Sequence, residues 1–119
     1  MRRDVERLRD IIEAIDAIEK YTVDGRKRFD NDELVRTWCL RHIEIIGEAV
    51  SRLSVPLRDT YSHAPWREVI GTRNALIHGY FDIDWSAVWN VVERDLPPFK
   101  AIISEILKES SESDLSDMP

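Results

Sequence analysis

The spacing of apolar residues along the chain predicts helices. Between residues 4 and 21 the apolar positions recur every three or four residues, which is the spacing of one face of an α-helix. The same spacing returns over residues 31–53, 66–80 and 85–108, and one short helical turn is expected at 57–61. No stretch shows the alternation of a half-buried strand that would argue for a sheet. The pattern predicts an all-α fold, an antiparallel bundle of four to five helices.

Residues that end or disturb helices lie between and within these segments. Residues 22–30 are polar and are expected to form a loop. The loop holds the basic run 26–28, which fits either a solvated loop or a phosphate-contacting patch. Pro97 and Pro98 lie inside the last helix and are expected to kink or split it. Gly47 lies inside the second helix, where a missing side chain would allow another helix to approach closely.

Length and composition limit the class of protein. A chain of 119 residues suits one domain, so residues 1–108 are expected to form a single helical domain. Residues 109–119 are acidic and rich in serine, which predicts a disordered tail. No apolar run approaches the roughly 20 residues that span a bilayer, and the charged N-terminus is unlike a signal peptide. We therefore expect a cytoplasmic protein that has no membrane partner.

The net charge and the positions of cysteine and histidine further limit which ligands and metal ions the protein could bind. The net charge of −6 gives no sign of nucleic-acid binding, so any RNA contact needs a local positive patch. Cys39 is the single cysteine, and its place among apolar helical residues predicts a small core residue. His42 and His63 have no Cys or His at zinc-site spacing. We expect neither a metal ion nor another cofactor.

The residues best suited to chemistry are Arg73, Asn74, His78 and Tyr80. On a continuous helix 66–80, Asn74 and His78 are neighbours, and Arg73 and Tyr80 share an adjacent face. A guanidinium binds phosphate oxygens, and an imidazole exchanges protons near neutral pH. RNA supplies its own nucleophile, the 2′-hydroxyl, so the protein need only move protons and stabilise charge. The set therefore suits phosphodiester cleavage.

Each of these residues also has a purely structural interpretation. A lone histidine in a helical protein is more often an ordinary, satisfied side chain than a catalyst. Arg73 could form an ion pair with Glu44 or Glu48 of the second helix. Tyr80 could be an amphipathic core residue. Spacing alone does not choose between these interpretations and catalysis.

A family resemblance favours catalysis. The segment Arg73–Asp84 closely resembles the signature of HepT-like HEPN proteins, in which Arg is followed after four to six residues by His, one further residue and Tyr. Residues 43–49 and 88–97 resemble the flanking signatures of that family. The resemblance extends over residues 1–108. It implies a HEPN-type helical bundle that forms a homodimer and acts as a metal-independent endoribonuclease, with the two motifs facing each other across the dimer cleft.

The resemblance also implies roles for individual residues and a partner. Arg73 and His78 would be catalytic, Asn74 would position them, and Glu48 and Gly79 would be supporting residues. Many such proteins are toxins paired with a minimal nucleotidyltransferase antitoxin that adds AMP to the motif tyrosine, here Tyr80. Such a group would block RNA sterically and repel its phosphates.

Two other functions remain open at this point. The chain could be a non-catalytic HEPN binding module that docks a nucleotidyltransferase or a nucleotide. It could also be a dimeric scaffold whose polar residues are structural. Loss of RNA cleavage in His78→Ala would favour the ribonuclease. Complex formation without cleavage would favour the binding module.

Overall fold

The computed structural model describes residues 2–78 and 82–116, and helices form nearly all the regular structure of this part of the chain, as the apolar spacing predicts. Because α6, η1 and α7 follow one another without a break, the described chain forms six separate helices rather than four to five. Ile77 and Ile83 form an isolated antiparallel bridge. The elements are α1 (Arg2–Thr22), α2 (Arg26–Asn31), α3 (Glu33–Ser51), α4 (Val55–Thr60), α5 (Trp66–Leu76), α6 (Trp85–Asn90), the π-helical segment η1 (Val91–Asp95) and α7 (Leu96–Ser116).

The short helix α2 occupies the segment expected to be a polar loop, so that expectation is wrong. Gly25 precedes it with a φ of 89°, a backbone conformation that favours glycine. Phe29 then turns into the core, where it is fully buried, and this contact holds the helical turn. Both arginines of the basic run are paired. Arg28 contacts Asp24 at 2.8 Å, and Arg26 contacts Asp30 at 3.4 Å.

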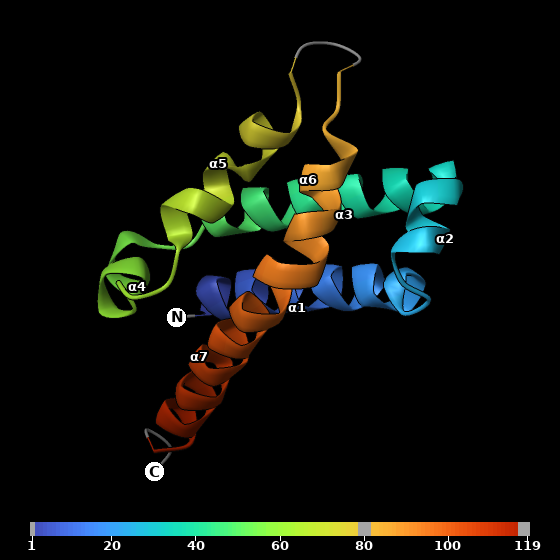
Figure 1. Cartoon of the computed structure of the whole chain (residues 1–119). Coiled ribbons are helices and arrows are strands. Elements are labelled where there is room, and N and C mark those ends of the chain that lie inside the picture. Colours follow the sequence, from blue (N-terminus) through green and yellow to red (C-terminus); the bar gives the residue numbers. More distant parts are fainter. Residues whose placement is uncertain (1, 79–81, 117–119) are drawn as a thin grey trace.

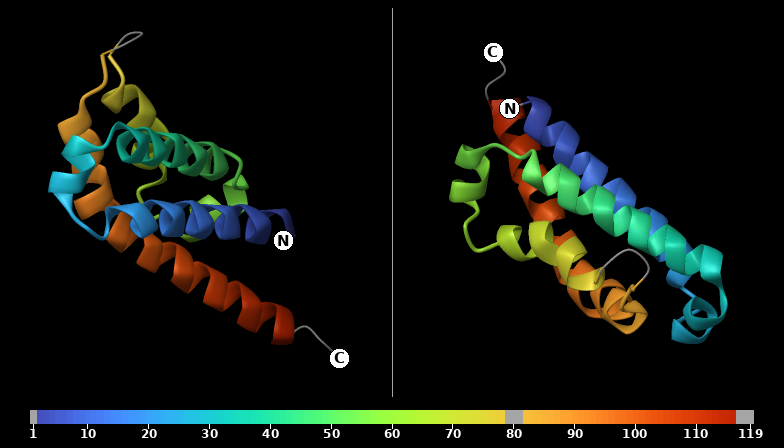
Figure 2. Two further views of the ribbon diagram at one scale, coloured as in Figure 1. Left: turned by 90° about the vertical axis from the view of Figure 1, so that its right-hand side faces the viewer. Right: turned by 90° about the horizontal axis from the view of Figure 1, so that it is seen from above.

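Helices α1 and α3 lie antiparallel and side by side, and the other helices pack around this pair (Figure 1). The continuous rod α6–η1–α7 crosses them and reaches the end of the molecule where the C-terminus lies (Figures 1 and 2). Helix α5 packs against α3 and leads into the connection to α6. This arrangement places the segment after α5, which carries His78, at the end of the molecule opposite the C-terminus.

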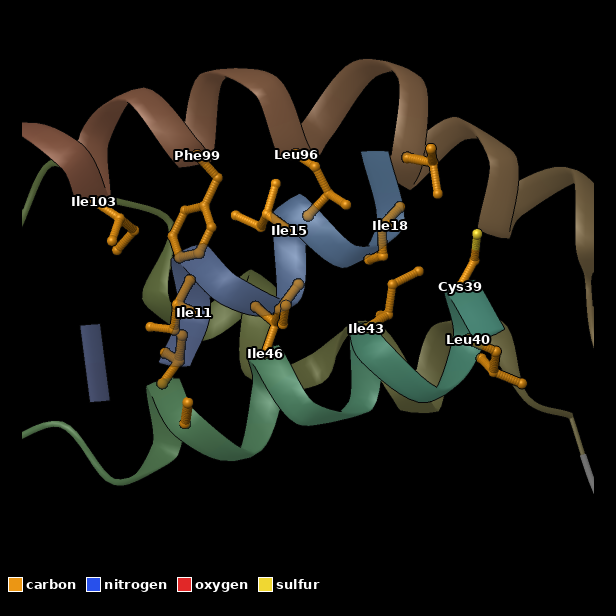
Figure 3. Packing of buried hydrophobic residues seen from close by; sticks show 14 of the residues in the cluster. Ile11, Ile15, Ile18, Cys39, Leu40, Ile43, Ile46, Leu96, Phe99 and Ile103 are labelled. Carbon is orange, nitrogen blue, oxygen red and sulfur yellow. The ribbon is translucent and has the colours of Figure 1, made fainter. Parts of the chain in front are cut away.

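Apolar faces of α1, α3 and α7 meet in the core (Figure 3). Removing a large aliphatic side chain from water stabilises a fold by about 1.5–3 kcal/mol, so these faces hold the bundle together. Cys39 has no exposed surface, which confirms it as a core residue, and burial raises the pKa of its thiol to about 11. The labelled side chains are Ile11, Ile15 and Ile18 of α1, Cys39, Leu40, Ile43 and Ile46 of α3, and Leu96, Phe99 and Ile103 of α7.

The two prolines change the hydrogen-bond pattern of the last helix without ending it. The N–H of Leu96 donates to the carbonyl of Val91, five residues earlier, which makes a π-helical turn directly before Pro97 and Pro98. Proline has no N–H to give to the carbonyl four residues before it and would clash with that turn. The wider π-helical turn places the change in hydrogen-bond pattern before the prolines, and α7 then continues.

Helix α7 continues to Ser116, and so enters the segment 109–119 for which composition predicts disorder. No Gly or Pro between residues 108 and 116 stops it. Glu109 is tied to the end of α4, since its carboxylate accepts a hydrogen bond of 2.6 Å from the Tyr61 hydroxyl. None of the helices within residues 2–78 and 82–116 has the length and apolar character needed to cross a membrane.

Candidate active site

Helix α5 ends at Leu76, four residues before the end predicted from spacing. Ile77 is extended, with φ −112° and ψ 113°, and it pairs with Ile83 across the connection to α6. Both isoleucines pack on the core, and this packing favours a paired, extended backbone over another helical turn. The helical geometry predicted for His78 is therefore wrong. His78 lies on an extended stem beyond the helix on which Asn74 lies.

Two backbone hydrogen bonds hold this stem. The N–H of Asp84 donates to the carbonyl of Leu76 at 2.9 Å, and the N–H of His78 donates to the carbonyl of Asp82 at 2.7 Å. The Asp84 carboxylate also caps α6 by accepting the N–H of Ala87 at 3.0 Å. The backbone of His78 is thus fixed from both sides of the connection. Gly79 and Tyr80 lie outside the residues that the structure describes.

Arg73 lies in the last turn of α5 and pairs with Glu44 of α3. Its Nε lies 3.4 Å from Oε2 of Glu44, and the arginine side chain is 57% exposed while the glutamate side chain is 29% exposed. Glu48, the other carboxylate considered from the sequence, contacts Arg52 of its own helix at 2.9 Å. The ion pair considered for Arg73 is therefore present, and Glu44 is the partner.

Gly47 lies where the two helices that carry this pair come close together. A Cβ atom at Gly47 would lie 3.5 Å from the carbonyl oxygen of Val69 and 4.0 Å from that of Ile70. The predicted approach of another helix is therefore present, but a Cβ atom would make ordinary van der Waals contact here, so the spacing does not require glycine. Because Gly47 follows Glu44 by three residues, the close approach lies beside the ion pair.

The side chains of Asn74 and His78 are exposed. Within residues 2–78 and 82–116, no hydrogen bond or ion pair engages either side chain, so both are available to a ligand. Next to Glu44, a groove of about 450 Å³ runs between α1 and α3. Three arginines and four carboxylates line it, so the groove has no positive excess with which to attract RNA.

The described residues contain no group of three or more His, Cys, Asp or Glu placed to hold a metal ion. The histidines that spacing excluded from a zinc site lie apart in the fold. His42 is on α3, where Nδ1 lies 2.8 Å from the carbonyl of Trp38, and His63 is on the link between α4 and α5. The end of α5 and the segment after it thus offer the Arg73–Glu44 ion pair, the Asn74 amide and the His78 imidazole.

Residues 11–106 match the family described as Ribonuclease HepT-like. The chain belongs to this family. It is 38% identical to "Putative RNase MJ1380" of Methanocaldococcus jannaschii, over 83% of this chain and 93% of that protein. It is 34% identical to "Probable ribonuclease HepT" of Thermococcus cleftensis, over 85% of this chain and 93% of that protein.

A further relative is a longer protein. "Gamma-glutamylcyclotransferase and putative RNase MJ0434" of Methanocaldococcus jannaschii is 40% identical over 92% of this chain. This chain spans 50% of that relative's length. No solved structure matches the chain.

In this HepT-like chain the arrangement can perform part of a phosphodiester cleavage. The Nε of Arg73 faces Glu44, so the two terminal nitrogens of the guanidinium can take a phosphate. An imidazole such as that of His78 can accept or donate a proton. Cleavage requires one group that removes a proton and another that supplies one, and the imidazole of His78 suits either role.

Proposed function

We propose that this chain is a metal-independent endoribonuclease toxin that cuts RNA in a cleft between two identical copies. The observation that carries the proposal is the placement of Arg73 and His78. Both side chains are exposed, and both lie on backbone that is fixed, by α5 for one and by the hydrogen-bonded stem for the other. Membership of the HepT-like ribonuclease family supports the same activity.

The proposed reaction uses the substrate's own hydroxyl. The 2′-oxygen attacks the adjacent phosphorus, the bond from phosphorus to the 5′-oxygen breaks, and the products are a 2′,3′-cyclic phosphate and a 5′-hydroxyl. A neutral His78 takes the proton of the 2′-hydroxyl, and the protonated His78 of the second copy gives a proton to the 5′-oxygen. Arg73 stabilises the negative charge that develops on the phosphoryl oxygens, and Asn74 positions the phosphate. Since the nucleophile belongs to RNA, no metal-bound water is needed.

The test is RNA cleavage by the purified chain in EDTA. The wild-type chain should release 2′,3′-cyclic phosphate ends, and His78→Ala should lose at least about 100-fold in rate because general acid–base catalysis contributes that much. His63→Ala is the matched control, since His63 is also exposed but lies on a different connection. Equal cleavage by His78→Ala and wild type, with both dimeric by analytical ultracentrifugation, would refute the proposal.

We also propose that a minimal nucleotidyltransferase antitoxin silences the enzyme by adding AMP to Tyr80. The tyrosine oxygen would attack the α-phosphorus of ATP and release pyrophosphate. The added phosphate would place negative charge beside Arg73 and His78 and repel RNA. Incubation with the partner and ATP should add one AMP to the wild-type chain and none to Tyr80→Phe, as read by intact mass. A complex that forms with no RNA cleavage by the free chain would instead favour the binding module.

A further inference from the structure

The ion pair between Arg73 and Glu44 joins two helices at the candidate active site. The residues are 29 positions apart in the chain, and the contact links the Arg73 Nε to one carboxylate oxygen of Glu44 at 3.4 Å. From the sequence alone, this ion pair was an alternative to a catalytic role for Arg73. In the fold both roles are compatible, because the contact uses one edge of the guanidinium.

Glu44 is the better-fixed member of the pair. Its side chain is 29% exposed, against 57% for Arg73, and it lies on α3, which packs along both α1 and α5. Helices α3 and α5 also come close together at Gly47, about one turn further along α3. Leu76, nearly fully buried, holds the end of α5 against the core. Glu44 is thus the less exposed partner of a long arginine side chain, and it lies on a helix that is packed on two sides.

We propose that Glu44 is a positioning residue, which holds Arg73 so that its two terminal nitrogens face the scissile phosphate. This inference rests on the proposed ribonuclease function. A guanidinium offers donors on two edges, and a carboxylate on the Nε edge leaves the edge formed by Nη1 and Nη2 for a bidentate phosphate contact. Fixing the side chain beforehand removes an ordering cost from the reaction.

The opposite role, in which Glu44 competes with RNA for Arg73, fits the geometry less well. A competitor would occupy the terminal nitrogens, whereas Glu44 contacts Nε. The two roles predict opposite changes in the cleavage rate when Glu44 is removed. A competitor would slow the wild-type enzyme, so its removal would speed cleavage. A positioning residue would speed the reaction step, so its removal would slow cleavage.

The experiment compares three variants of the full chain in RNA cleavage, with kcat and KM measured separately. Glu44→Ala should lower kcat about tenfold, because the arginine loses its orientation, and should leave KM unchanged or lower, because a negative charge near the phosphate is removed. Glu44→Gln keeps an acceptor oxygen of the same reach and should retain most of kcat. Glu19→Ala is the matched control, since Glu19 pairs across α1 and α7 with Lys100 at 3.0 Å.

A second measurement does not depend on cleavage. The Nε–H of Arg73, assigned by NMR through its loss in Arg73→Lys, should exchange slowly with water in the wild type and rapidly in Glu44→Ala. If Glu44→Ala keeps the wild-type kcat or exceeds it, while Arg73→Ala is impaired, the positioning role is wrong and the proposed ribonuclease stands. If the wild-type chain does not cleave RNA, the proposed function fails and the inference fails with it.

Discussion

Gly47 gives a quantitative test of how closely α3 and α5 approach. Gly47→Ala adds a Cβ atom 3.5 Å from the carbonyl oxygen of Val69, which is ordinary van der Waals contact. Alanine is favoured over glycine inside a helix by about 0.8–1.0 kcal/mol, so the free energy of unfolding should rise by up to about 1 kcal/mol. For a domain of this size the melting temperature should then rise by up to about 4 °C.

Gly71 is the matched control, because it lies within α5 and nothing is within 4 Å of a Cβ built there. Gly71→Ala should therefore give the helix-propensity gain alone. The difference between the two variants in urea denaturation measures the cost of the contact with Val69. Gly47→Leu should cost about 1–3 kcal/mol, because its outer atoms must displace the α5 backbone. A Gly47→Ala variant less stable than wild type, alongside a stabilised Gly71→Ala, would refute the described spacing.

Three other groups give predictions that standard measurements can check. Asp4 is buried and accepts hydrogen bonds from the Ser54 amide at 2.9 Å and the Ser54 hydroxyl at 2.6 Å, so Asp4→Ala should cost about 3 kcal/mol in chemical denaturation and Asp4→Asn about half of that. Cys39, buried with its pKa raised to about 11, should react with a thiol reagent at pH 8 only in denaturant. The hydrogen bond to Glu109 raises the pKa of Tyr61 to about 12, so its phenol should ionise well above pH 10 in an ultraviolet titration that uses Tyr61→Phe to identify its signal. The stabilisation from that bond is complete below pH 10, the ordinary pKa of the group, and is lost as the pH rises through 12. Glu109→Gln should lower the pKa of Tyr61 toward 10.

The apolar spacing predicts the long helices well because their faces are long. Helices α1 and α3 each present several turns of apolar residues, and both form close to the predicted bounds. Short helices and extended segments that pair with each other show less periodicity in the sequence. Phe29 alone among charged neighbours gives no period, so α2 could not be predicted. Ile77 fits the helical period of α5, but its pairing with Ile83, a contact formed only in the folded chain, makes it extended.

The candidate site shows the same limit. The motif residues Arg73, Asn74 and His78 can be proposed as site residues from the sequence. The sequence does not show whether Glu44 or Glu48 pairs with Arg73. They are four residues apart and lie on one face of α3, so either suits an arginine on a neighbouring helix. The relative register of α3 and α5 decides between them, and that register depends on packing in three dimensions.

The π-helical turn before the prolines determines which side of α7 faces the rest of the protein. From Val88 to Leu96 the buried positions advance eight residues, whereas two ordinary turns take about 7.2. The wide turn accommodates the surplus residue. Deleting one residue there would repair the hydrogen-bond ladder locally, yet it would rotate everything beyond by about 100° and carry Phe99 and Ile103 away from α1. We expect the residues of this π-helical turn to tolerate substitution but not deletion. Natural variation in chain length should therefore fall in the connections between helices.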